Sequence, residues 1–193
     1  MHDEGMDVPA VLERSLVEAH DRFVENVRDI SIEQALDAAG GYRSILGIVK
    51  HVAAWSAVYH SYAFESEPRH WDATDWPRGL RDRIDPSQQY LDEVRAWFER
   101  TFERWERSLR DGPDPEEPRG VHWGGRIPLA DIVVAVSQHW TYHAGEINAI
   151  RAIQLGEAWE YTEEVEENHI ATAGHRVRPG WMTDEEASQV EER

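Results

Sequence analysis

The sequence predicts an all-α protein built as a four-helix bundle. Four segments of about 20–28 residues place apolar side chains three or four positions apart, the spacing of a helix with one buried face. No segment alternates apolar and polar residues convincingly enough to indicate a strand. Hydrophobic residues make up 40% of the 193-residue chain and include nine Trp. This is enough apolar material for the core of one domain.

The first two predicted helices cover about residues 8–29 and 44–64. Pro9 is tolerated in the first turn of the first helix, and Ser44 is a good N-cap for the second. The expected inward stripe of the first helix is Val8, Leu12, Leu16, Phe23 and Val27. That of the second helix is Ile45, Ile48, Val52, Trp55, Tyr59 and Tyr62. Few residues, centred on AAGGY, separate the two helices, so we expect a tight reversal between them.

The third and fourth predicted helices cover about residues 86–110 and 128–155. Pro86 is the expected first residue of the third helix. Its inward stripe is Tyr90, Leu91, Val94, Trp97, Phe98, Phe102, Trp105 and Leu109. That of the fourth helix is Leu129, Ile132, Val133, Val136, Trp140, Ile147 and Ile150.

Two loops between the predicted helices are long. The stretch from Glu65 to Asp85 is rich in Pro, Trp and charge. It is long enough to cross the whole bundle, so the second and third helices could run parallel. The loop DGPDPEEPRGVHWGGRI, before the fourth helix, is long enough to fold over one end of the bundle.

Composition limits the domain organisation and the partners. We expect residues 8–155 to form the bundle and the strongly acidic residues 156–193 to form a C-terminal helical extension and tail. The net charge of −18 argues against nucleic acid and anionic membranes as partners. No apolar run approaches the roughly 18–20 residues of a membrane span, and the N-terminus lacks a signal-peptide pattern, so we expect a cytoplasmic protein. The chain has no Cys, hence no disulfide, no thiolate ligand and no cysteine nucleophile.

Three histidines occupy matching positions on two of the predicted helices. His139 and His143, in SQHWTYHAGEIN, are four positions apart and so lie on one helix face. Both fall at the inner edge of the apolar stripe, as does His51 in SILGIVKHVAAW. If these helices pack together, three neutral imidazoles can bind zinc, nickel, copper or iron and leave one position open for water or substrate. The alternative is that they hydrogen-bond to neighbours or to water.

The order and context of these histidines resemble the DinB/YfiT-like family of metal-dependent enzymes. The matching features are His51 in the second helix and HWTYHAGEI in the fourth, and the resemblance covers roughly residues 8–155. It implies a four-helix bundle of up-down-down-up order, with a long crossover between helices two and three. It also implies one divalent metal, commonly zinc or nickel, on His51, His139 and His143. Related members are transferases or isomerases that use the thiols mycothiol or bacillithiol, and others are hydrolases.

The role of Glu146, one turn after His143, has three interpretations. It could orient a ligand imidazole, act as a base, or be an ordinary surface carboxylate. HWTYH lacks the Glu of HExxH, so a metalloprotease is excluded. Our leading hypothesis is a metal-dependent enzyme that activates an exogenous thiol, or water for hydrolysis, on a small molecule. The alternative is a non-catalytic stress protein that binds a metal or a small molecule; a homodimer is left open.

Overall fold

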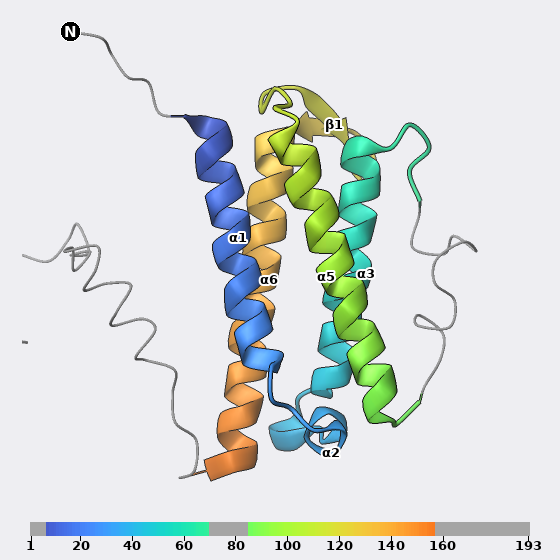
Figure 1. The fold of residues 1–193 in the computed structure, drawn as a ribbon, viewed down its shortest axis with the longest axis vertical. Helices are drawn as coiled ribbons and strands as arrows, with labels where there is room; N and C mark the ends of the chain where they lie inside the picture. The colour runs from blue at the N-terminus through green and yellow to red at the C-terminus, as the bar shows by residue number, and fades with distance from the viewer. Residues whose placement is uncertain (1–6, 70–84, 157–193) are drawn as a thin grey trace, which may run out of the picture. The chain divides into compact units, whose positions relative to one another are not determined.

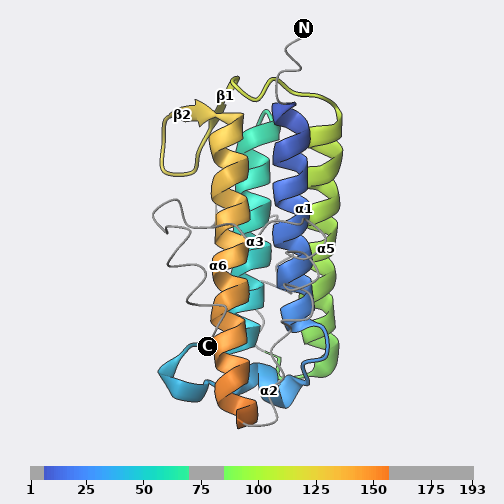
Figure 2. The ribbon, with the colours of Figure 1, turned by 90° about the vertical axis from the view of Figure 1, so that its left-hand side faces the viewer.

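The computed structural model describes residues 7–69 and 85–156 and shows a four-helix bundle (Figure 1). The long helices are α1 (Val8–Val27), α3 (Ile45–Phe64), α5 (Gln88–Arg110) and α6 (Leu129–Leu155). α1 packs on α6, and α3 packs on both α5 and α6. Figures 1 and 2 show α1 and α6 running in one direction and α3 and α5 in the other. The all-α class is therefore confirmed, and the second and third long helices run parallel, as the up-down-down-up order requires.

Parts of the expected architecture lie outside the described residues. These are the interior of the crossover, residues 70–84, and nearly all of the expected C-terminal helical extension, residues 157–193. The division into a bundle at 8–155 and an extension at 156–193 therefore stays a prediction. Within residues 7–69 and 85–156, no helix is long and apolar enough to cross a membrane.

Short polar side chains begin three of the long helices. Asp7, Ser44 and Ser87 each accept a hydrogen bond from a backbone N–H in the first turn, at 3.2–3.3 Å. Such caps satisfy N–H groups that have no partner inside the helix. Ser44 caps α3 as predicted. The prediction for Pro86 is wrong, because the next residue is the N-cap and Pro86 precedes it.

The predicted apolar stripes form the core of the bundle. Val8 lies outside this core and is 40% exposed, because it is the first residue of α1. Trp55, Tyr59 and Tyr62 on α3 are only partly buried. The largest fully buried side chains come from all four helices and include Leu16, Phe23, Ile45, Ile48, Tyr90, Leu91, Phe98, Trp105, Ile132, Trp140 and Ile147.

One serine in the core joins three helices. The Trp140 Nε1–H donates to Ser56 Oγ at 2.6 Å, and the Trp105 Nε1–H donates to the Ser56 carbonyl at 3.1 Å. The Ser56 hydroxyl in turn donates to the carbonyl of Val52 at 2.5 Å. A buried donor without a partner costs about 1–3 kcal/mol, so Ser56 stabilises the packing of α3 against α5 and α6.

The connection from α1 to α3 differs from the expected tight reversal. It contains a short helix, α2 (Ile32–Leu36), and a 3₁₀ turn, η1 (Ala39–Gly41). Ile30 and Ala35 are buried, which explains why the chain coils there: it covers the apolar end of the bundle. Gly40 has a φ of +63°, in the left-handed region where residues with a Cβ are strained.

A small hairpin covers the opposite end of the bundle. Strands β1 (Pro118–Gly120) and β2 (Arg126–Pro128) pair antiparallel, although the sequence predicts no strand. Three residues are too few to show a periodicity. Val121 is 3% exposed, and Gly120 lies against Tyr62 of α3. The hairpin therefore folds over the end of α3, as the length of this loop allows (Figure 1).

Candidate metal centre

The structure brings the three predicted histidines together. His51 lies on α3, and His139 and His143 lie one turn apart on α6. The Nε2 atom of His139 is 3.1 Å from the Nε2 of His51 and 3.1 Å from the Nε2 of His143. One nitrogen from each ring lies within 4.8 Å of those of the other two rings. The three rings thus direct nitrogen atoms toward one point between two helices.

This spacing fits a tetrahedral metal ion. Zinc binds imidazole nitrogens at about 2.0–2.1 Å, so two ligand nitrogens of a tetrahedron lie about 3.3 Å apart. The closest pairs of the cluster are near this value. Neutral imidazoles that face one another nitrogen to nitrogen can share at most one hydrogen per pair. A cation between them would satisfy all three lone pairs at once.

The surroundings keep the three rings in the neutral form that binds metals. Burial, with the neighbouring His143 and Arg43, lowers the pKa of His51 to about 4. Burial and the adjacent imidazoles lower the pKa of His139 to about 3. Burial also lowers the pKa of His143. At neutral pH the imidazoles are therefore unprotonated, as metal ligation requires.

Glu146 contacts a histidine of the cluster directly. Its carboxylate lies 2.7 Å from Nδ1 of His143, whose Nε2 faces His139, so Nδ1 carries the hydrogen and donates it. Arg43 donates to the same carboxylate from Nη2 at 3.1 Å and from Nε at 3.3 Å. Burial alone would raise the pKa of the Glu146 carboxyl, but the hydrogen bonds from Arg43 and His143 outweigh it and lower the pKa. Glu146 is thus an ionised acceptor for one ring of the cluster.

The sequence analysis did not identify Arg43. It lies in the connection just before α3 and meets Glu146 across 103 residues of sequence. No local pattern indicates such a contact. Arg43 matters because it ties the connection below the bundle to the helix that carries two of the three histidines.

His139 and His143 differ in the hydrogen-bond partner of Nδ1. Its Nδ1 is buried and, among residues 7–69 and 85–156, has no hydrogen-bond partner. His143, by contrast, has the Glu146 carboxylate as acceptor for its Nδ1, the ring nitrogen that faces away from the cluster. The three rings are therefore not equally fixed.

Aromatic residues continue from the cluster along α3. Trp55 is one turn beyond His51, and the centroids of the two rings are 6.3 Å apart. Tyr59 follows one turn later, with its ring 6.3 Å from that of Trp55. Two rings of the hairpin lie beside them. The ring centroid of His122 is 4.5 Å from that of Trp55, and the ring centroid of Trp123 is 6.2 Å from that of Tyr59. We call Trp55, Tyr59, His122 and Trp123 the aromatic strip.

Two other buried histidines lie apart from the cluster. His20 contacts Glu99 at 2.9 Å and Asp21 at 3.0 Å. Burial alone would lower the pKa of His20, but the bonds to these carboxylates outweigh it and raise the pKa. His60 Nε2 lies 3.0 Å from Ser108 Oγ, and burial with a nearby guanidinium lowers the pKa of His60 to about 4. Both residues hold helices together.

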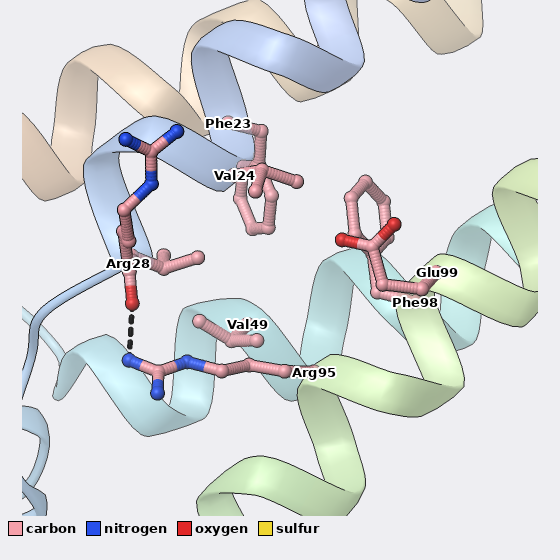
Figure 3. Close-up of a pocket in the computed structure, with 8 residues that line it drawn as sticks. Phe23, Val24, Arg28, Val49, Arg95, Phe98 and Glu99 are labelled. Carbon is pink, nitrogen blue, oxygen red and sulfur yellow. Dashed lines mark hydrogen bonds between the residues drawn. The ribbon is translucent and has the colours of Figure 1, made fainter.

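A small apolar cavity lies between α1, α3 and α5 (Figure 3). Its volume is about 60 Å³, and Arg95 at its edge donates a hydrogen bond to the carbonyl of Val27. None of the three histidines lines it. Its walls are Phe23, Val24, Val27, Arg28, Val49, Arg95, Phe98 and Glu99. The cavity is too small for a substrate of ordinary size and is separate from the candidate metal centre.

The fold and the cluster together define a helical-bundle protein with three histidines that could hold a metal ion between two helices. A family model described as mycothiol-S-transferase matches residues 11–156, and the chain belongs to this family. The expected resemblance to the DinB/YfiT-like family is thereby confirmed. Comparison with curated proteins and with solved structures finds no match.

Proposed function

We propose that this protein is a metal-dependent thiol S-transferase that uses mycothiol as its thiol. His51, His139 and His143 would hold one divalent ion, zinc or nickel. The observation that supports this most directly is the convergence of three neutral imidazoles with nitrogens 3.1 Å apart. When bound there, the ion would lower the pKa of a coordinating thiol so that thiolate forms at neutral pH.

The transfer needs a sulfur from outside the chain. The protein has no Cys, so the nucleophile must come with the co-substrate. The thiol loses its proton to solvent, and its sulfur forms a bond to an electrophilic carbon of a small molecule. In a displacement, the leaving group departs with the electron pair of the broken bond; in an addition to a double bond, the neighbouring carbon takes up a proton.

The hydrogen bonds of Glu146 favour S-transfer over hydrolysis as the function. A base that activates water must accept a proton, but Arg43 and His143 already occupy the Glu146 carboxylate and lower its pKa. We therefore assign Glu146 the role of orienting His143. Hydrolysis and metal binding without turnover are the alternative functions, and the reaction panel described below distinguishes them from S-transfer. The homodimer and the cytoplasmic location stay predictions.

The test is a panel of reactions with metal-replete protein. An electrophile that becomes fluorescent on thiolation is offered with mycothiol, bacillithiol, glutathione or no thiol, and activated esters are offered without thiol. We expect turnover with mycothiol that depends on metal and is lost in His143→Ala. Ester turnover without thiol would favour a hydrolase. The absence of both activities in protein that holds stoichiometric metal would favour the non-catalytic alternative.

A further inference from the structure

The aromatic strip is placed where the body of a ligand bound at the three histidines would lie. At a rise of 1.5 Å per residue, Trp55 lies about 6 Å and Tyr59 about 12 Å along α3 from His51. Trp55 and Tyr59 are half-buried, and Trp123 is 58% exposed. The strip therefore begins at the candidate metal centre and leads outward to solvent along one face of the bundle.

The members of the strip are chemically alike. All four are rings, and none is a carboxylate or a guanidinium. Two of them come from α3 and two from the hairpin, which packs on the end of α3. The charged groups at the cluster, Arg43 and Glu146, are already paired with each other. This is a surface for an uncharged ligand with apolar faces and polar edges.

We propose that the aromatic strip binds the sugar rings of the thiol co-substrate, an inference that rests on the proposed function. Mycothiol carries its thiol on an N-acetylcysteinyl arm that is joined by an amide to two linked rings, glucosamine and inositol. With the sulfur at the three histidines, an arm of a few bonds brings the first ring to Trp55. The second ring then reaches Tyr59 and the hairpin.

The chemistry of the two surfaces is complementary. The face of an aromatic ring is negative, and the C–H groups on the face of a sugar ring are weakly positive, so the two pack together. The hydroxyl groups at the sugar edge find donors and acceptors in the polar tips of Trp and Tyr side chains. The strip thus distinguishes a thiol with a sugar body from a bare thiol, while the histidines act on the sulfur in both.

The decisive experiment compares two thiols that share the same arm. The KM for mycothiol and the KM for N-acetylcysteine amide, which has the same uncharged arm but no sugar, are measured for wild type, Trp123→Ala and Trp55→Leu. We expect the variants to raise the KM for mycothiol about three- to tenfold, in the range of one lost ring contact, and to leave that for N-acetylcysteine amide unchanged. Trp55→Phe should restore most of the mycothiol affinity. Val134→Ala, an exposed apolar change on α6, is the control and should alter neither.

The outcomes separate this inference from the proposed function. The sugar-binding role would be overturned if the KM for each thiol were the same in every variant as in wild type. It would also be overturned if the variants raised the KM for the electrophile instead. If no S-transfer occurs at all, binding of glucosaminyl-inositol to the protein as purified is followed by tryptophan fluorescence. Binding that is weakened in Trp123→Ala would then support the strip although the proposed function had failed, and no binding to wild type would refute it. Circular dichroism of each variant shows that the fold is kept.

Discussion

Replacing Glu146 tests whether the hydrogen bond to His143 supports metal binding. In the wild type, the half-buried carboxylate accepts from His143 Nδ1 at 2.7 Å. Hydrogen bonds to a charged group contribute about 1.5–3 kcal/mol, and neutral ones about 0.5–1.5 kcal/mol. Glu146→Gln keeps an oxygen acceptor but removes the charge, so it should cost about 1–1.5 kcal/mol, or about five- to tenfold in the metal Kd. Glu146→Ala removes the acceptor and should cost about 30- to 100-fold, near the upper limit for such partners.

The assay is competition for Zn²⁺ with a chromophoric chelator at pH 7.5. Asp131→Asn is the matched control, because it removes the charge of the other carboxylate of α6. Asp131 lies in the first turn, about two turns before His139 along the helix. Its Kd should equal that of wild type. The order wild type, Gln, Ala is the essential result. A Kd for Glu146→Ala equal to that of wild type would show that the contact between Glu146 and His143 contributes nothing to the affinity for metal.

Four further predictions concern ligand loss and stability. Purified wild type should contain about one equivalent of zinc or nickel, and His139→Ala should contain almost none in elemental analysis, since two remaining ligands hold an ion poorly; equal metal content would refute the assignment. Ser56→Ala leaves the buried indole N–H of Trp140 without its acceptor and should lower the free energy of unfolding by about 1–3 kcal/mol in urea denaturation. Burial lowers the pKa of His60 to about 4, so the unfolded state binds more protons than the folded state between about pH 6.5 and 4. The free energy of unfolding should therefore decrease by on the order of 3 kcal/mol as the pH falls through this range. His60→Phe should show a shallower decline in urea denaturation. His20 has the opposite sign: its raised pKa stabilises the fold below about pH 6.5, and this contribution disappears as the pH rises through the folded-state pKa, so His20→Gln should be more destabilising at pH 5.5 than at pH 8.5.

The long helices could be predicted because each has a repeating apolar stripe. The structure buries nearly all of the predicted side chains, including every one on α5. What the sequence did not predict lies between the helices. The α2 turn and the hairpin strands are too short for a periodicity, and they form because buried residues such as Ile30 and Val121 cover the two ends of the bundle. Those contacts exist only once the helices are packed.

The candidate site also contains residues that the sequence predicted and residues that it did not. His51, His139 and His143 could be placed on inner helix edges from spacing alone, since helical geometry converts a count of residues into a direction. Arg43 lies outside a long helix, and its partner Glu146 is remote in sequence. Its role depends on where the loop below the bundle meets α6, which no local pattern encodes. The aromatic contacts of the hairpin with α3 were missed for the same reason.

The unequal support of the histidines has a consequence for metal exchange. The His143 ring is held by an anionic acceptor, whereas Nδ1 of His139 has no partner among the described residues. An imidazole that is held on one side only turns more easily about its side-chain bonds. A metal ion at this centre would therefore be held more firmly by His143 than by His139. A chelator that is small enough to reach the His139 side should then accelerate metal release beyond the spontaneous rate.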